Sequence, residues 1–98
     1  MFLKIHERMG KKVVAVCDKE LIGKVYEEGD AILDLKTYKN FYMGKLVTEE
    51  EAIKHLAEFN SANIVGKKSV SLALGLKLCE KSEVRTIAGV PHIQIYKF

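Results

Sequence analysis

Hydrophobic and polar positions alternate with a period of two at the beginning of the chain. Leu3 and Ile5 alternate with basic side chains at positions 4, 6 and 8, which predicts a half-buried strand. After a turn at residues 9–12, the apolar run 13–17 predicts a second and more deeply buried strand. The same patterns predict further short strands at residues 25–26, 31–35, 41–43, 84–87 and 92–96.

Two later segments carry the helical period. Thr48 and Glu51 form the pattern of a capping box, in which each side chain bonds to the backbone amide of the other residue. We expect a helix from there to about Asn60. A second helix is predicted from about Gly66 to about Cys79, and it is apolar on most of its circumference. Such a helix is typically buried against more than one neighbour.

The order of these elements predicts the fold class. Strands come first, two helices follow in the second half, and strands end the chain. We therefore expect an α+β two-layer sandwich, in which a mostly antiparallel sheet packs on two helices and leaves its other face partly open. Asp18 is expected to cap a short helical turn after the second strand. Residues 1–98 contain no repeat or linker and are predicted to form one domain.

Composition places the chain among globular proteins, because 48% of its 98 residues are hydrophobic and 30% are charged. No apolar stretch approaches the roughly 20 residues that span a bilayer. The first residues also lack the apolar core of a signal peptide. We therefore predict a cytoplasmic protein with no membrane partner. Lysine and glutamate outnumber arginine and aspartate, which favours a heat-adapted source.

Five short segments in the same order carry a family resemblance. They are Ala15-Val16-Cys17-Asp18, Leu21-Ile22-Gly23-Lys24, Glu28-Gly29-Asp30, Ser61-Ala62-Asn63-Ile64-Val65-Gly66 and Ala88-Gly89-Val90-Pro91-His92. On these segments the chain resembles, over nearly its whole length, the archaeal family called domain of unknown function 424. The resemblance implies a small cytoplasmic archaeal α+β protein. It implies no activity and no catalytic residues.

The segment between the two predicted helices is the first candidate site. Gly66 lets the backbone approach a ligand, and free amides at the following helix start favour an anion. Lys67 and Lys68 add point charges suited to phosphate. The segment is not a Walker A loop, because Ser61 stands where that motif needs glycine. The alternative is a helix–helix connection in which Ser61 and Asn63 make capping bonds and the lysines are solvated.

Residues 88–92 form the second candidate site. Pro91 makes Val90 extended and stiffens the entry to the last strand. His92 is then held in a fixed position that suits binding or proton transfer. The alternative is a turn histidine bonded to the backbone, because the sequence identifies no partner for its imidazole.

A sheet face is the third candidate site. Lys4, His6 and Arg8 share one side of the first predicted strand, and residues 92, 94 and 96 share one side of the last. If these strands are neighbours and the two sides coincide, the open face is basic and carries the ring of Tyr96. Basic groups with a stacking ring are typical of a platform for single-stranded RNA. A solvated sheet face explains the same residues.

Positive charge gathers in the second half of the chain. The formal net charge is +3; residues 51–98 hold seven Lys and Arg against four Asp and Glu, and residues 1–50 hold nine of each. The excess accompanies Lys67, Lys68 and Arg85. Weak, salt-sensitive binding of phosphate is therefore predicted in this half.

The spacing of cysteines and histidines gives no support to metal or cofactor chemistry. Cys17 and Cys79 form no Cys-x-x-Cys pair and are expected to be reduced and packed in or near the core. His6, His55 and His92 lack the spacing of zinc ligands. We predict no metal and no cofactor.

Three interpretations of function stay open. The first is a non-catalytic binding protein for RNA or a phosphate-bearing ligand in a translation-related context. The second is a protein-assembly subunit or homodimer, with apolar anchors at residues 41–43 and 98. The third is a small enzyme that uses His92 with Ser61, Asn63 or Cys17, although no nucleophile–base pair is visible in the sequence.

Overall fold

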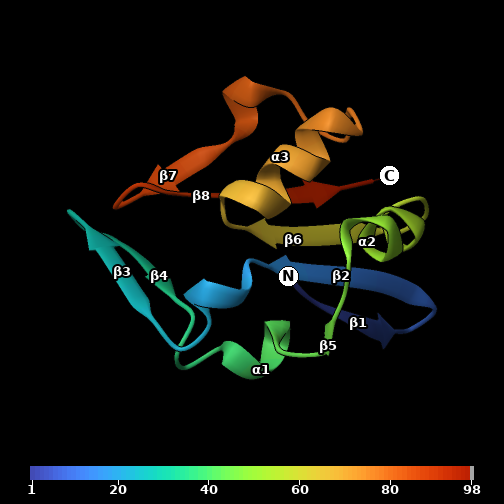
Figure 1. Ribbon diagram of the computed structural model, residues 1–98, viewed down its shortest axis with the longest axis horizontal. Coiled ribbons are helices and arrows are strands. Elements are labelled where there is room, and N and C mark those ends of the chain that lie inside the picture. Colours follow the sequence, from blue (N-terminus) through green and yellow to red (C-terminus); the bar gives the residue numbers. More distant parts are fainter. Residues whose placement is uncertain (98) are drawn as a thin grey trace.

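Six strands, four of which lie at segments predicted to be strands, form one sheet (Figure 1). The structure, a computed structural model, describes residues 1–97. The strands are β1 (Phe2–Arg8), β2 (Lys11–Cys17), β5 (Lys45–Leu46), β6 (Ser61–Val65), β7 (Arg85–Ile87) and β8 (Val90–Tyr96). Their order is β5-β1-β2-β6-β8-β7, and only β2 and β6 pair in parallel. The predicted α+β class with a mostly antiparallel sheet is confirmed, and the sheet is mixed.

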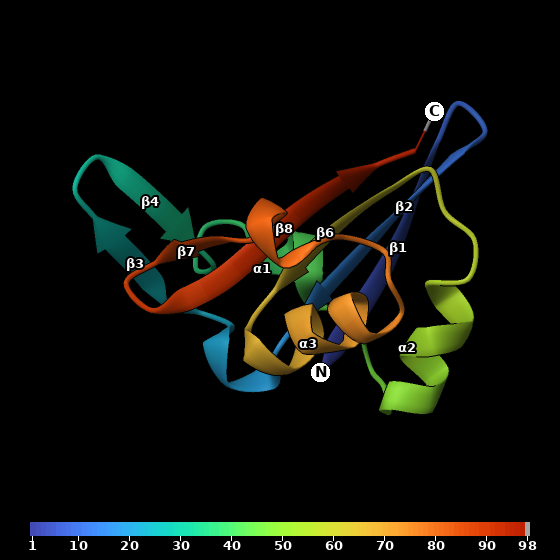
Figure 2. The same cartoon turned by 90° about the horizontal axis from the view of Figure 1, so that it is seen from above.

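One face of the sheet packs against two helices, α2 (Glu49–His55) and α3 (Lys67–Gly75). Figure 2 shows both helices on the same side of the sheet. Alternate residues of the central strands point to this side and meet apolar side chains of the helices, which buries a continuous core. The fully or nearly buried members of this core include Val14, Val16, Ala52, Leu56, Ala62, Ile64, Val70, Ala73 and Ile93.

The opposite face is covered over part of its area by a hairpin and a third helix. The hairpin consists of β3 (Val25–Glu28) and β4 (Ala31–Asp34), and α1 (Lys39–Tyr42) packs against β1 and β2. A second buried cluster forms there from Cys17, Leu35, Val65 and Val90. The predicted two-layer sandwich on two helices is therefore not confirmed.

Both predicted helices are shorter than their hydrophobic patterns. The helix predicted to reach Asn60 ends at His55, because the backbone of Asn60 joins the sheet through bonds to Lys12 and Lys97. The helix predicted to reach Cys79 ends at Gly75. Two residues later, Lys77 adopts a φ of 59°, a left-handed conformation that ends helices.

Two connections also differ from the predictions. Residues 61–65, the predicted helix–helix connection, form the strand β6, which pairs with β2 on one side and β8 on the other. Residues 41–43 were predicted to be extended, but α1 includes the first two of them. Short 3-10 turns occupy Lys19–Leu21 (η1) and Lys81–Glu83 (η2).

Candidate functional site

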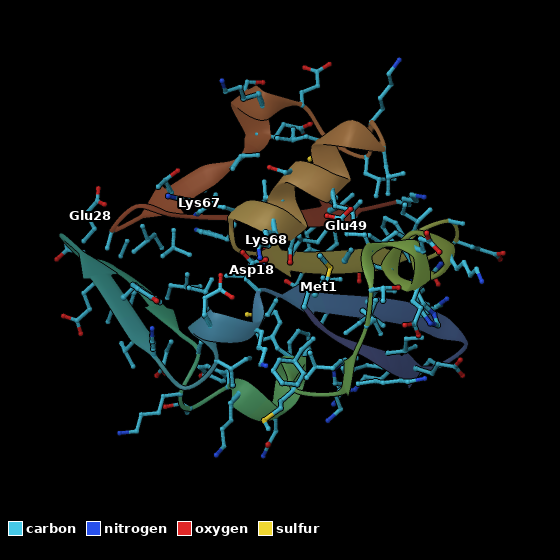
Figure 3. All side chains as sticks on the ribbon, in the orientation of Figure 1. Met1, Asp18, Glu28, Glu49, Lys67 and Lys68 are labelled. Carbon is cyan, nitrogen blue, oxygen red and sulfur yellow. The ribbon has the colours of Figure 1, made fainter. Side chains whose placement is uncertain are left out.

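The start of α3 is held by a side chain from the end of β2 (Figure 3). The Asp18 carboxylate is 3% exposed and accepts hydrogen bonds from the Lys68 amide at 3.0 Å, the Ser69 amide at 2.9 Å and the Ser69 hydroxyl at 2.6 Å. Gly66 precedes the helix with a φ of 107°, and a Cβ there would lie 2.3 Å from the Asp18 carboxyl carbon. Only glycine lets the carboxylate approach the helix this closely.

This arrangement changes the roles expected of two sequence features. The prediction that Asp18 caps its own turn is wrong, because its side chain makes no capping bond to η1 and serves α3 instead. The amides of Lys68 and Ser69 are not free, and a negative charge already occupies the positive end of the helix. Lys67 and Lys68 are exposed beside this internal cap.

The segments 61–69 and 85–92 are neighbours, and Lys67 lines two concavities together with residues of 86–91, whereas Arg85 and His92 line a different one. The Gly66 amide donates to the Pro91 carbonyl at 2.8 Å, so their backbones touch. The Lys67 side chain shares a shallow concavity with Pro91 on the helix side of the sheet. Because successive residues of a strand point to opposite faces, His92 and its cross-strand partner Arg85 face the other way.

The sheet face opposite α2 and α3 gathers most of the other predicted residues. We name it the open face. The strands β1 and β8 are not neighbours, because β2 and β6 lie between them. The register nevertheless places Lys4, Ala15, Asn63 and Gln94 in one row across the sheet. The predicted sides of β1 and β8 therefore lie on the same face of the sheet. The adjacent row contains His6, Val13, Ser61 and Tyr96.

The basic side chains of β1 hold α1 against the sheet. The Lys4 ammonium donates to the Asn40 carbonyl at 2.7 Å, and His6 Nε2 donates to the Phe41 carbonyl at 2.9 Å. The His6 and Phe41 rings also stack, with centroids 4.5 Å apart and an interplanar angle of 11°. These groups dock a helix, so the basic platform predicted on β1 is largely covered.

A groove lies on the open face between α1 and the β4 strand. Its volume of about 510 Å³ is in the range of small-ligand sites. We name it the aromatic groove, and Asp34 is the charged residue among those that line it. Its lining residues are Ile32, Leu33, Asp34, Leu35, Tyr38, Phe41, Tyr42, Asn63 and Gln94.

A second concavity of about 690 Å³ lies at the edge of the sheet, where β7 stops. The pairing of β7 with β8 ends at His92, so the following residues of β8 have no strand beside them on this side within residues 1–97. We name this concavity the edge notch. It meets the aromatic groove at Gln94, which lines both. Its lining residues are Ser82, Glu83, Arg85, His92, Ile93, Gln94 and Tyr96.

The His92 ring lines the edge notch and contains one polar atom that has no partner within residues 1–97. Its Nε2 is buried and has no hydrogen-bond partner within residues 1–97. Burial and the charge of Arg85 lower the pKa of His92, so the imidazole is neutral at pH 7. The Arg85 side chain is exposed and forms no ion pair with residues 1–97. The neutral His92 ring and a free guanidinium therefore line the same concavity, while the Nε2 atom itself is buried.

Cys17, one of the three proposed catalytic partners of His92, lacks the required geometry and reactivity. The Cys17 thiol donates to the Asp18 carbonyl at 3.4 Å. Burial and the neighbouring Asp18 charge raise the pKa of Cys17 to about 12, which leaves it a thiol at neutral pH and a poor nucleophile. Val65 stands between Cys17 and His92 in the register, so the two backbones lie about 9.5 Å apart.

Residues 1–97 contain neither a cluster of metal ligands nor a membrane-spanning helix. No group of three or more histidine, cysteine, aspartate or glutamate side chains is arranged to hold a metal ion. No helix in this part of the chain has the length and apolarity needed to cross a membrane.

The family of the chain follows from comparison with known proteins. A family model described as "Protein of unknown function (DUF424)" matches residues 6–98. The chain belongs to this family. Its fold is similar to that in the crystal structure of an uncharacterised conserved protein from Methanopyrus kandleri, with a TM-score of 0.74 and 26% identity over 97% of this chain and 89% of the other. No curated protein matches the chain. The resemblance noted in the sequence is thus confirmed.

Sequence reasoning found some residues of the open face and missed others. The prediction named Asn63, Arg85 and His92, which line the two concavities. It missed the groove wall formed by Tyr38 and the short helix that follows. The signal available in the sequence was Tyr38, an aromatic residue within the polar segment 36–40. The structure leaves its side chain 63% exposed.

Proposed function

We propose that this protein is a non-catalytic binding protein for single-stranded RNA, and that the strand lies across the aromatic groove and the edge notch. The observation that carries the proposal is the meeting of these two concavities at Gln94. One supplies aromatic rings and amides, and the other supplies a guanidinium, an imidazole and an exposed tyrosine. Stacking rings beside basic groups are the usual means of holding unpaired nucleotides.

One exposed cation and one exposed ring support this path, and Glu83 also lines the edge notch. Arg85 is exposed in the edge notch, where its guanidinium can pair with a phosphate. Tyr96 is 63% exposed on the same strand as Gln94 and offers a ring on which a base can stack. By contrast, the α3 start already holds the Asp18 carboxylate, which takes up the amides of Lys68 and Ser69.

Fluorescence anisotropy with a labelled, unstructured RNA of about 10 nucleotides tests the proposal. Arg85→Ala should weaken binding and reduce the slope of log K against log salt by about 0.7, because one phosphate contact is lost. Tyr96→Ala should weaken binding about five- to 100-fold, the usual cost of losing one stacked base. Both side chains are exposed, so both variants are expected to fold.

The double variant Lys67→Ala/Lys68→Ala is the matched control, because it removes two exposed charges on the helix side. It should lower affinity less than Arg85→Ala alone. The proposal fails if the RNA does not bind at low salt. It also fails if the Lys67/Lys68 variant loses more affinity than the Arg85 variant.

Protein assembly is a second candidate, favoured by the uncovered edge of β8 after His92. An unpaired edge can accept a strand from another chain. The anchors predicted from sequence fit less well, since Phe41 and Tyr42 are half-buried, Met43 is 48% exposed and Phe98 lies outside the described residues. Light scattering across a concentration series should show association if this candidate holds, and a constant monomer mass would contradict self-assembly.

A further inference from the structure

The aromatic groove has rigid walls. The Phe41 ring is stacked on His6 on one side and meets the Tyr42 ring edge-on, with centroids 5.1 Å apart and planes at 81°. Hydrogen bonds from Lys4 and His6 to the α1 backbone hold the same helix in place. Tyr38 adds an exposed ring at the rim. The groove is thus shaped before any ligand arrives, which reduces the entropy lost on binding.

Two amide side chains form the groove floor. Asn63 and Gln94 are directly opposite in the antiparallel pair β6–β8, which places their Cβ atoms about 5 Å apart. The Gln94 oxygen accepts a hydrogen bond from the Tyr96 hydroxyl at 3.3 Å, which leaves its amide nitrogen available to donate. Asn63 presents both a donor and an acceptor. The floor can therefore bond to a planar group with acceptors and donors along one edge.

The groove itself offers no cation to a phosphate. Asp34 accepts hydrogen bonds from the Lys36 amide at 3.0 Å and the Thr37 amide at 2.8 Å. The bonds from Thr37 hold the pKa of Asp34 below its ordinary value, so the carboxylate is charged at neutral pH. No lysine or arginine is among the lining residues. An uncharged ring that carries an amino group suits this surface better than an anion does.

We infer that the aromatic groove is a nucleobase pocket that selects adenine, with the base held between the aromatic walls and its edge bonded to Asn63 and Gln94. This inference rests on the proposed function and names the base that the RNA site prefers. Asparagine and glutamine amides pair with the N6 amino group and N7 of adenine. Uracil has no amino group to offer the floor or the nearby Asp34 carboxylate.

Competition between homopolymers tests the selection. Anisotropy is measured with labelled oligoadenylate, oligocytidylate and oligouridylate of equal length, using the full chain. Oligoadenylate should bind about tenfold more tightly than oligouridylate, toward the lower end of the range for one bidentate base contact. Gln94→Ala and Asn63→Ala should each reduce this preference to about twofold or less. Ser71→Ala, exposed on α3, is the control that should keep the full preference.

The outcomes separate the two proposals. Equal binding of all three oligomers, still weakened by Arg85→Ala, would overturn adenine selection and leave the RNA site standing. Tightest binding of oligocytidylate would also overturn it, as would a preference that survives both amide substitutions. If no oligomer binds at low salt, both proposals fail. Gln94 is exposed and Asn63 half-buried, so circular dichroism on the two variants distinguishes a lost contact from a lost fold.

Discussion

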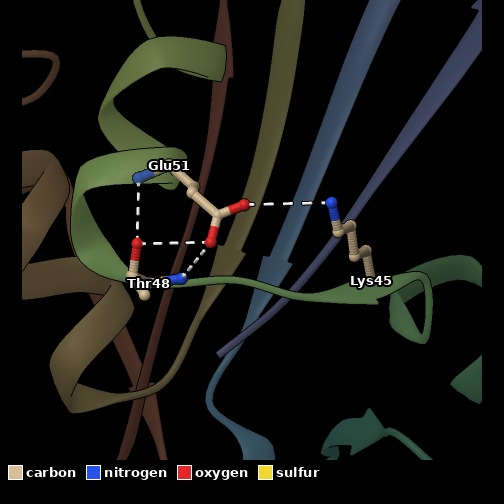
Figure 4. Close-up of polar contacts among 3 residues, drawn as sticks. All are labelled: Lys45, Thr48 and Glu51. Carbon is tan, nitrogen blue, oxygen red and sulfur yellow. Dashed lines mark hydrogen bonds and ion pairs between the residues drawn. The ribbon is translucent and has the colours of Figure 1, made fainter.

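The two longer helices begin in opposite ways. At the start of α2, Thr48 and Glu51 cap the helix locally: the Glu51 amide donates to the Thr48 hydroxyl at 3.2 Å, and the Thr48 amide donates to the Glu51 carboxylate at 3.3 Å (Figure 4). At the start of α3, the cap is Asp18, which lies 50 residues before Lys68. The first cap is exposed, whereas the second is buried.

The difference shows what each cap does for the fold. The local cap stabilises one helix and can be recognised from three neighbouring positions. The remote cap joins the end of β2 to the first turn of α3, so it stabilises the packing of the helix on the sheet. It also neutralises the helix end. Exposed polar side chains that can bind a ligand also lie on the open face, at Gln94 and Arg85.

Gly66→Ala is expected to break the remote cap most severely. The added methyl would overlap the Asp18 side chain, and alanine is strained at a φ of 107°. The free energy of unfolding should fall by more than about 3 kcal/mol, measured by urea denaturation.

Gly75→Ala is the matched control on the same helix. No atom lies within 4 Å of the added methyl, and Gly75 does not have a positive φ. Stability should rise by up to about 1 kcal/mol, because alanine favours a helix over glycine. Equal effects of the two substitutions would show that Gly66 is not needed for the approach of Asp18.

Asp18→Ala should cause the next largest loss. It leaves two backbone amides and the Ser69 hydroxyl without their acceptor in a buried place. We expect a loss of about 2–4 kcal/mol in the free energy of unfolding. Asp30→Ala, at an exposed turn, should change it by less than about 0.5 kcal/mol. Similar losses from the two variants would contradict the role of the remote cap.

The two caps also show how much of the fold could be predicted from sequence. The Thr48 capping box was predicted and is confirmed, because both partners are three residues apart. The role of Asp18 was not, because its partners depend on the parallel pairing of β2 with β6. β6 itself was predicted to be a connection, since Ser61 and Asn63 give a strand buried between two others a polar appearance.

The candidate site was predictable to a similar extent. Alternation placed His92, Gln94 and Tyr96 on one side of the last strand, and the structure keeps them together. The aromatic wall was not predictable, because Tyr38 and Phe41 reach the sheet only when the chain folds back after the β3–β4 hairpin. Sequence patterns reveal which residues share a strand face, but not which distant connection covers that face.

Cys17, which directly precedes Asp18, allows a test with a smaller expected effect that depends on pH. Burial and the Asp18 charge raise its pKa from 9.0 to about 12, so the folded state favours the neutral thiol. The contribution of the neutral Cys17 thiol to the free energy of unfolding is complete below pH 9 and is lost as the pH rises toward 12. Urea denaturation between these values should show a shallower decline for Cys17→Ala than for the wild type.

Tyr42 titrates in the same alkaline range and provides the control. Burial and the nearby Cys17 raise its pKa to about 12 as well. Tyr42→Phe removes this contribution and should leave the part of the decline that belongs to the thiol. If the stability of Cys17→Ala declines with pH as steeply as that of the wild type, ionisation of the buried thiol does not destabilise the fold.

Thr48→Ala should have the smallest effect, because the local cap is exposed and serves one helix. The substitution removes the acceptor of the Glu51 amide, and the free energy of unfolding should fall by about 1 kcal/mol. Lys45→Ala is its control, since Lys45 reaches Glu51 at only 3.9 Å with a side chain that is 80% exposed. That variant should change stability by less than about 0.5 kcal/mol. If Thr48→Ala proved as costly as Asp18→Ala, the contrast between a local and a fold-wide cap would be wrong.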